Sequence, residues 1–162
     1  MNKKRKSGIL LHPTSLPGKF GIGTFGKEAY AFVDFLIRSG QSLWQICPLG
    51  HTGYGDSPYQ CFSAFAGNPL LIDLEILTQK NLLTQEEITP PLFPEDSVDY
   101  GEVIKWKFPI LEKAFENFSK NANITDNAKF NNFIIKNNDW LDDYALFMSL
   151  KDEFNGKSWF TW

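Results

Sequence analysis

The first third of the chain alternates between short apolar runs and one amphipathic segment. Residues 8–11 are an apolar run that ends before Pro13, and residues 43–49 form a second run with little polarity. Between them, residues 27–39 carry apolar side chains at the i, i+3, i+4 and i+7 positions, a spacing typical of an amphipathic helix. The order strand, helix, strand predicts a parallel β-α-β unit whose strands are covered on both faces.

Residues 50–69 break this pattern, because glycine and proline recur throughout the segment. No regular helix or strand tolerates glycine and proline at this frequency, so we expect a long loop here. Loops of this length are usually functional or disordered, and the aromatic residues of this one argue against disorder. The loop follows the second predicted strand directly.

The rest of the chain is predicted to be mainly helical. Residues 103–118 carry large apolar side chains at helical spacing, and a second helix is expected near residues 128–136. A third helix is expected to follow Asn138 or Asp139, either of which could cap its start.

Composition excludes several classes of function. The net charge of −3 gives no electrostatic footprint for nucleic acid, and the run Lys3-Lys4-Arg5-Lys6 is best explained as part of a solvated, disordered tail over residues 1–6. No apolar stretch reaches the length of a membrane span or of a signal-peptide core. Two cysteines and two histidines indicate neither a disulfide framework nor a zinc site, so we expect a cytoplasmic protein without metal or cofactor.

A glycine pattern opens the predicted helix. Residues 21–26, GIGTFG, match the G-x-G-x-x-G pattern of dinucleotide-binding folds. In those folds the pattern follows a strand directly and an acidic residue ends the next strand. Here residues 13–20 intervene and the second run ends in Cys47-Pro48-Leu49. We therefore expect the glycines to form a tight turn into the helix.

The segment of residues 52–60, TGYGDSPYQ, has the residue types of a sugar site. Sugars present C–H faces that stack on aromatic rings and hydroxyls that pair with short polar side chains. Tyr54 and Tyr59 supply rings, and Asp56, Ser57 and Gln60 supply donors and acceptors. A compact loop packed by its own tyrosines would have the same composition, and the chemistry alone leaves both possibilities open.

Three segments together resemble one known family. They are residues 8–18 (GILLHPTSLPG), residues 53–69 (GYGDSPYQCFSAFAGNP) and residues 140–147 (WLDDYALF). The chain resembles the 4-α-glucanotransferases of glycoside hydrolase family 77, which include amylomaltase and disproportionating enzyme. The resemblance runs from about residue 7 to the end of the chain, and the 53–69 segment is its most specific part.

The resemblance implies an α/β fold, a (β/α)₈ TIM barrel with a helical subdomain inserted after its second strand. Residues 7–50 would then be the first β-α-β of the barrel, and residues 51–69 a loop on the substrate side. Residues 70–162 would form the mainly helical insertion, truncated before the rest of the barrel.

The resemblance also implies the activity, a transfer of α-1,4-linked glucan segments to an acceptor glucose or maltodextrin by retaining double displacement. The three carboxylates that the family uses lie on later strands, so we expect no catalytic residue in this chain and no activity from it alone. The implied partners are maltooligosaccharides or α-1,4-glucans.

Site residues carry over from the family only where the motif matches. Ser57 and Tyr59 are implied as glucan contacts beside the cleavage point, with Asp56 and Gln60 supporting them and Tyr54 as a stacking platform. His12 is expected to satisfy loop backbone rather than to contact substrate. The alternatives are a non-catalytic α-glucan-binding module and an α-amylase-like hydrolase.

Overall fold

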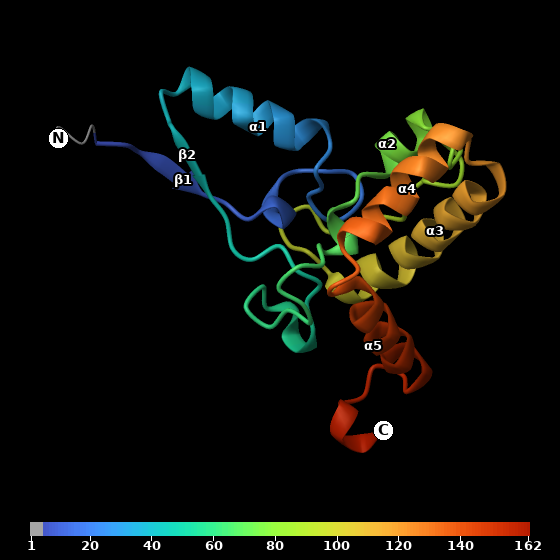
Figure 1. Cartoon of the computed structure of the whole chain (residues 1–162). Helices are drawn as coiled ribbons and strands as arrows, with labels where there is room; N and C mark the ends of the chain where they lie inside the picture. Colours follow the sequence, from blue (N-terminus) through green and yellow to red (C-terminus); the bar gives the residue numbers. More distant parts are fainter. Residues whose placement is uncertain (1–4) are drawn as a thin grey trace.

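A parallel pair of short strands opens the structure. The computed structural model describes residues 5–162, so residues 1–4 of the predicted tail and the side chain of Tyr54 lie outside the described part. β1 (Gly8–Leu10) pairs in parallel with β2 (Leu43–Gln45), and α1 (Lys27–Arg38) connects them (Figure 1). The predicted β-α-β unit is confirmed.

The expectation that both strands are covered on both faces is wrong for this chain. Leu10 is 62% exposed and Leu43 is 51% exposed. The contact between α1 and the sheet runs through Phe32, whose ring lies 4.9 Å from that of Trp44. A two-stranded sheet beside one helix has only one partner layer, which leaves the remaining faces in solvent.

Four further helices follow an antiparallel hairpin of residues 50–67. Their bounds are α2 (Leu74–Gln79), α3 (Tyr100–Asn121), α4 (Ile124–Lys136) and α5 (Leu141–Glu153). Short 3₁₀ turns lie at Pro13–Ser15, Tyr54–Asp56, Pro69–Leu71 and Trp159–Thr161. The helices predicted at 103–118 and 128–136 are confirmed as α3 and α4. Helix α2 was not predicted from the apolar spacing, because it is only six residues long.

The predicted start of the third helix is wrong. Trp140 occupies the N-cap position of α5 and makes no capping hydrogen bond through its side chain. Instead, the carbonyl of Asn137 accepts hydrogen bonds from the backbone N–H groups of Trp140 (3.2 Å) and Leu141 (2.9 Å). The turn after α4 therefore runs directly into α5, so neither Asn138 nor Asp139 is needed as a cap.

The hydrophobic core lies away from the strands. One cluster joins Phe20 to Leu74, Leu83, Ile88 and Ala114, and so packs the segment after β1 against α2 and α3. A second cluster of Ile22, Leu70 and Val103 continues it toward the hairpin. The chain before α1 and the helices after the hairpin therefore share one core.

The glycines of the GIGTFG segment serve close packing. Gly21 has φ of 73°, and Gly23 lies so close to the carbonyl of Pro13 that a side chain would collide with it. The carboxylate of Asp73 lies against Gly26, the N-cap residue of α1, and accepts a hydrogen bond of 2.6 Å from the Thr24 hydroxyl. A carboxylate thus occupies the helix terminus where a nucleotide phosphate would bind. This arrangement agrees with the tight turn that the sequence predicts.

Candidate functional site

Residues 50–67 form a short antiparallel hairpin, which we call the site hairpin. Its rungs are the pairs Gly50–Gly67 and Thr52–Cys61, and the N–H of Gly53 donates to the carbonyl of Gln60 at 3.1 Å. The loop expected here is therefore ordered by backbone pairing, which its glycine and proline content concealed.

The tip of the site hairpin is a tight turn. Gly55 and Asp56 both have positive φ, 72° and 52°. The N–H of Asp56 donates to the carbonyl of Gly53 at 3.2 Å, and the N–H of Gln60 donates to the carbonyl of Ser57 at 3.0 Å. Because the backbone groups pair with one another, the side chains of the tip are free to face outward.

A cavity of about 180 Å³ lies between the carboxyl ends of the two strands and the site hairpin. Its polar lining comes from four parts of the chain, namely the segment after β1, the site hairpin, its exit and the start of α3. The side chains are His12, Thr14, Thr52, Asp56, Asn68 and Tyr100.

His12 connects the ends of the two strands. Its Nδ1 accepts from the backbone N–H of Thr14 at 3.3 Å and lies 2.8 Å from the Thr14 hydroxyl. Nδ1 is therefore unprotonated, and Nε2–H donates to the carbonyl of Pro48 at 3.3 Å. His12 satisfies loop backbone, as predicted, and fixes the floor of the cavity.

Asp56 is the one predicted site residue with a described side chain that lines this cavity. It is half-buried, and desolvation raises the pKa of its carboxyl above the ordinary value. A partly desolvated carboxylate accepts hydrogen bonds strongly, so Asp56 is well suited to hold a hydroxyl donor.

Of the other predicted residues, Ser57, Tyr59 and Gln60 do not line the cavity. Tyr59 is 77% exposed, and its hydroxyl lies 3.9 Å from the Cys47 sulfur, a contact that raises the pKa of the phenol. Gln60 is exposed beside it, and the hydroxyl of Ser57 lies 3.4 Å from the N–H of Tyr59. The side chain of Tyr54 belongs to the part that the structure leaves undescribed.

Sequence reasoning missed several lining residues. Thr14, Asn68 and Tyr100 reach the cavity from segments far apart in the chain. Asn68 carried a local signal, because it precedes Pro69 and caps the following turn by accepting from the N–H of Leu70 at 3.0 Å. No local signal predicted that Tyr100 lines the cavity, because its position depends on how α3 packs.

The opposite face of the site hairpin packs against α5. The His51 ring lies 5.5 Å from the ring of Phe62, and its Nδ1 lies 3.3 Å from the Tyr144 hydroxyl. The Phe62 ring lies 5.9 Å from the ring of Phe147. Burial lowers the pKa of His51, which keeps the ring neutral near pH 7.

A buried cation supports the exit of the site hairpin. Lys107 of α3 is fully buried, and its Nζ donates to the carbonyl of Leu70 at 2.7 Å. Burial lowers the pKa of Lys107 to about 8, and the nearby Asp73 carboxylate opposes this effect. Leu70 lies two residues after Asn68, so Lys107 also secures one wall of the cavity.

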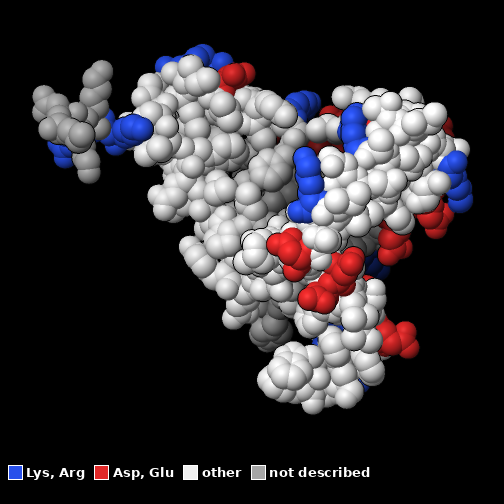
Figure 2. All heavy atoms as spheres, in the orientation of Figure 1, with Lys and Arg blue, Asp and Glu red and all other residues white. Residues whose placement is uncertain are grey.

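The surface around the site is poor in charge. Figure 2 shows charged side chains gathered over the helices that follow the site hairpin, while uncharged atoms dominate the visible surface near β1 and β2. Within residues 5–162, no group of three or more His, Cys, Asp or Glu side chains could hold a metal ion. Within the same residues, no helix has the length and apolar character needed to cross a membrane.

The chain is similar to known proteins over nearly its whole length. Residues 11–162 match the family model described as 4-alpha-glucanotransferase. The 4-alpha-glucanotransferase of Clostridium butyricum is 52% identical over 94% of this chain and 31% of its own length. That of Thermus thermophilus is 49% identical over 100% of this chain and 32% of its own length.

A solved structure agrees with these relatives. Amylomaltase from Streptococcus agalactiae in complex with acarbose superposes with a TM-score of 0.88 at 46% identity. The match covers 96% of this chain and 31% of that one. This chain therefore spans about a third of the length of the relatives it matches.

Proposed function

We propose a function on the premise that this chain belongs to the 4-alpha-glucanotransferase family, glycoside hydrolase family 77. The complete enzyme that contains it transfers a segment of α-1,4-linked glucan to the 4-hydroxyl of an acceptor glucose or maltodextrin. The chain supplies the first two strands of a (β/α)₈ barrel, a substrate-side hairpin and a helical insertion.

The observation that carries this proposal is the position of the polar cavity. It lies at the carboxyl ends of two parallel strands joined by a helix, and barrel enzymes bind their substrates at that end of the barrel. The similarity to a solved amylomaltase at a TM-score of 0.88 supports the same placement.

Each residue of the site hairpin has a proposed role in holding glucan. Asp56 accepts a hydrogen bond from a sugar hydroxyl inside the cavity, and Ser57 and Gln60 add polar contacts along the tip. The ring of Tyr59 is exposed and available for stacking on a sugar face. Tyr54 is proposed as a second stacking platform.

The proposed chemistry is a retaining double displacement. Such a reaction uses two carboxyls about 5–5.5 Å apart and passes through a covalent glycosyl-enzyme intermediate. We assign those carboxyls to later strands of the complete enzyme, and we place that enzyme in the cytoplasm. The part described here binds and orients the glucan and helps to exclude water, so that an acceptor sugar rather than water completes the second displacement.

The test is to incubate the complete enzyme with maltotriose and to follow the products by chromatography. Transfer predicts glucose together with maltodextrins longer than maltotriose. Products limited to glucose and maltose would show hydrolysis and would contradict the proposal.

The same assay tests the site hairpin. Replacing Tyr54 and Tyr59 together by alanine is expected to lower kcat/KM for maltodextrin by about tenfold or more, because each lost stacking contact contributes roughly 0.5–1.5 kcal/mol. Tyr30→Ala, on α1 and outside the site hairpin, serves as the matched control. Unchanged kinetics in the double variant would remove the assigned role of the tyrosines.

A further inference from the structure

The site hairpin has two chemically different faces. Gly50 and Thr52 line the cavity, whereas the ring of His51 between them packs against Phe62 on the opposite side. Phe62, on the returning strand, donates its N–H to the carbonyl of His51 at 3.0 Å, and its ring lies edge-on to His51. One face therefore lines the cavity and the other is an aromatic surface.

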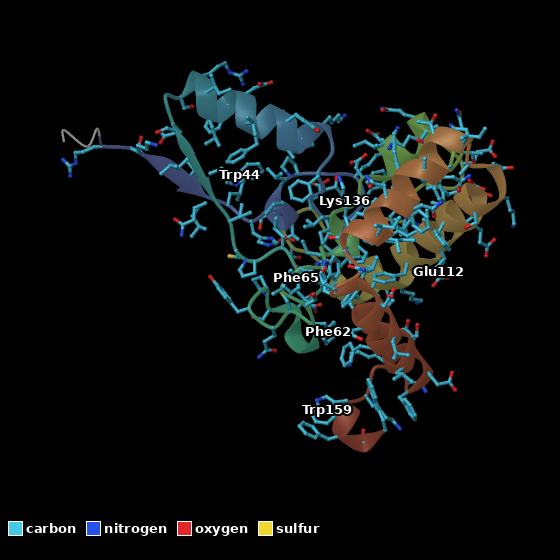
Figure 3. The ribbon with its side chains drawn as sticks, in the orientation of Figure 1. Trp44, Phe62, Phe65, Glu112, Lys136 and Trp159 are labelled. Atoms are coloured by element: carbon cyan, nitrogen blue, oxygen red, sulfur yellow. The ribbon has the colours of Figure 1, made fainter. Side chains whose placement is uncertain are left out.

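The aromatic face rests on helices formed much later in the chain. The His51 ring lies 5.9 Å from the ring of Phe108 in α3, and Phe62 packs on Phe147 of α5. The ammonium of Lys151 lies 4.9 Å from the centre of the Phe62 ring, which adds a cation–π contact. Figure 3 shows Phe62 on the side of the hairpin next to α5, and the Phe65 ring lies 5.8 Å from that of Trp140, the residue before α5.

One polar contact fixes the position of the site hairpin relative to α5. The Tyr144 hydroxyl and His51 Nδ1 are 3.3 Å apart, with both side chains partly buried. Ring contacts tolerate sliding, whereas a hydrogen bond in a partly buried setting fixes two atoms to one separation. His51 is adjacent in sequence to Thr52, which lines the cavity.

We infer that Tyr144 is a positioning residue for glucan binding. It acts through His51 to hold the site hairpin in the position in which its other face lines the cavity. Tyr144 itself does not line the cavity. The inference rests on the proposed function, since it concerns the same site. The helical insertion thereby takes part in substrate binding without contacting the substrate.

The test compares Tyr144→Phe with the unaltered complete enzyme. The variant keeps the ring and loses only the hydroxyl. We expect KM for maltodextrin to rise about three- to tenfold, the range of one lost hydrogen bond, with kcat within about twofold. Tyr30→Phe makes the same chemical change on α1, outside the cavity and the site hairpin, and should leave both constants unchanged.

A double-mutant cycle identifies the partner. His51→Phe keeps an aromatic ring and removes the nitrogen. If Tyr144 acts through His51, the double variant should raise KM no further than either single variant, whereas additive effects would overturn the assignment. A lowered melting temperature with unchanged KM would also overturn it, because that result describes a purely structural contact.

Hydrogen exchange separates this inference from the proposed function. In Tyr144→Phe the amides of residues 53–60 should exchange about threefold faster or more, because the hairpin opens locally. If the unaltered enzyme has no transferase activity, the proposed function fails while exchange still reports on the hairpin. Unchanged exchange at these amides would refute the positioning role by itself.

Discussion

At the scale of single residues, Lys107 is the most unusual side chain of the chain. It is fully buried, although lysine rarely is, and its ammonium donates to the Leu70 carbonyl. It lies four residues after Val103 and therefore on the buried side of α3, a position that the apolar spacing did not mark because lysine is charged. The Leu70 carbonyl and the Asp73 carboxylate that stabilise its charge could not be predicted, because both come from a distant segment.

Lys107 makes a testable contribution to the pH dependence of stability. Its pKa is about 8 in the folded protein and 10.5 in the unfolded chain, so the unfolded state binds more protons between these values. The contribution of Lys107 to the free energy of unfolding is therefore fully present above pH 10.5, where the side chain is neutral in both states. It is lost as the pH falls through about 8, where the buried side chain must take up a proton. Between pH 7 and 10.5 the protein should gain about 3 kcal/mol relative to Lys107→Met.

Urea unfolding at several pH values measures this difference. Comparison with Lys107→Met cancels the titration of all other groups, which the two proteins share. A difference that does not change with pH would show that the lysine is not desolvated in solution.

At the scale of elements, Asp73 joins three parts of the fold. Its Oδ1 accepts from the N–H of Ile76 and caps α2, its Oδ2 accepts from the Thr24 hydroxyl, and its charge opposes that of Lys107. The turn before α1, helix α2 and helix α3 therefore depend on one carboxylate.

Replacing this carboxylate should cost more than losing a cap. Asp73→Ala is expected to lower the free energy of unfolding by about 2–4 kcal/mol, because it removes the cap of α2 and leaves the buried Thr24 hydroxyl without its acceptor. Asp73→Asn can retain the cap and should cost roughly half as much. Asp99→Ala removes only an exposed cap, that of α3, and should cost about 1 kcal/mol.

Denaturant titration of the three variants gives the comparison. Equal losses for Asp73→Ala and Asp99→Ala would mean that Asp73 acts as a cap alone.

Elements were predictable where the signal is local. The β-α-β unit and helices α3 and α4 follow from apolar spacing, and strand–helix–strand order indicated the parallel pairing. The site hairpin was predicted only as a loop. Its backbone pairs, Gly50–Gly67 and Thr52–Cys61, cannot be found from the spacing of apolar residues. Its packing on α5 links residues as far apart as His51 and Tyr144, and such contacts are decided by tertiary structure.

Some residues of the candidate site could likewise be predicted from local sequence, and others could not. Tyr54, Asp56, Ser57, Tyr59 and Gln60 were proposed from sugar chemistry and family resemblance, and the structure places Asp56 at the cavity and Tyr59 at the surface. Thr14, Asn68 and Tyr100 were missed because three separate segments must fold before these side chains meet.

At the scale of the whole molecule, the 162 residues expose a large apolar area. Exposed apolar side chains occur along the whole described chain, and those on α1 and the strands include Leu10, Tyr30, Phe35, Ile37 and Leu43. Monomeric soluble proteins rarely leave so many apolar side chains together on the surface. This exposure disfavours a stand-alone glucan-binding module.

Expressed alone, the 162-residue chain should therefore bind a hydrophobic dye and associate as its concentration rises. Light scattering and dye fluorescence measure both effects. Ile37→Lys together with Leu10→Lys should reduce the fluorescence, since both side chains are more than half exposed. A monomeric chain that binds no dye would show that these faces are stable in water.

The contact between His51 and Tyr144 also constrains the order of events during synthesis. The two residues are 93 positions apart, and ribosomes add about 5–20 residues per second. For roughly 5–20 seconds the aromatic side of the nascent hairpin therefore lacks its contact with α5. During that interval its phenylalanines are open to chaperones, and slow codons between the two segments would lengthen the wait.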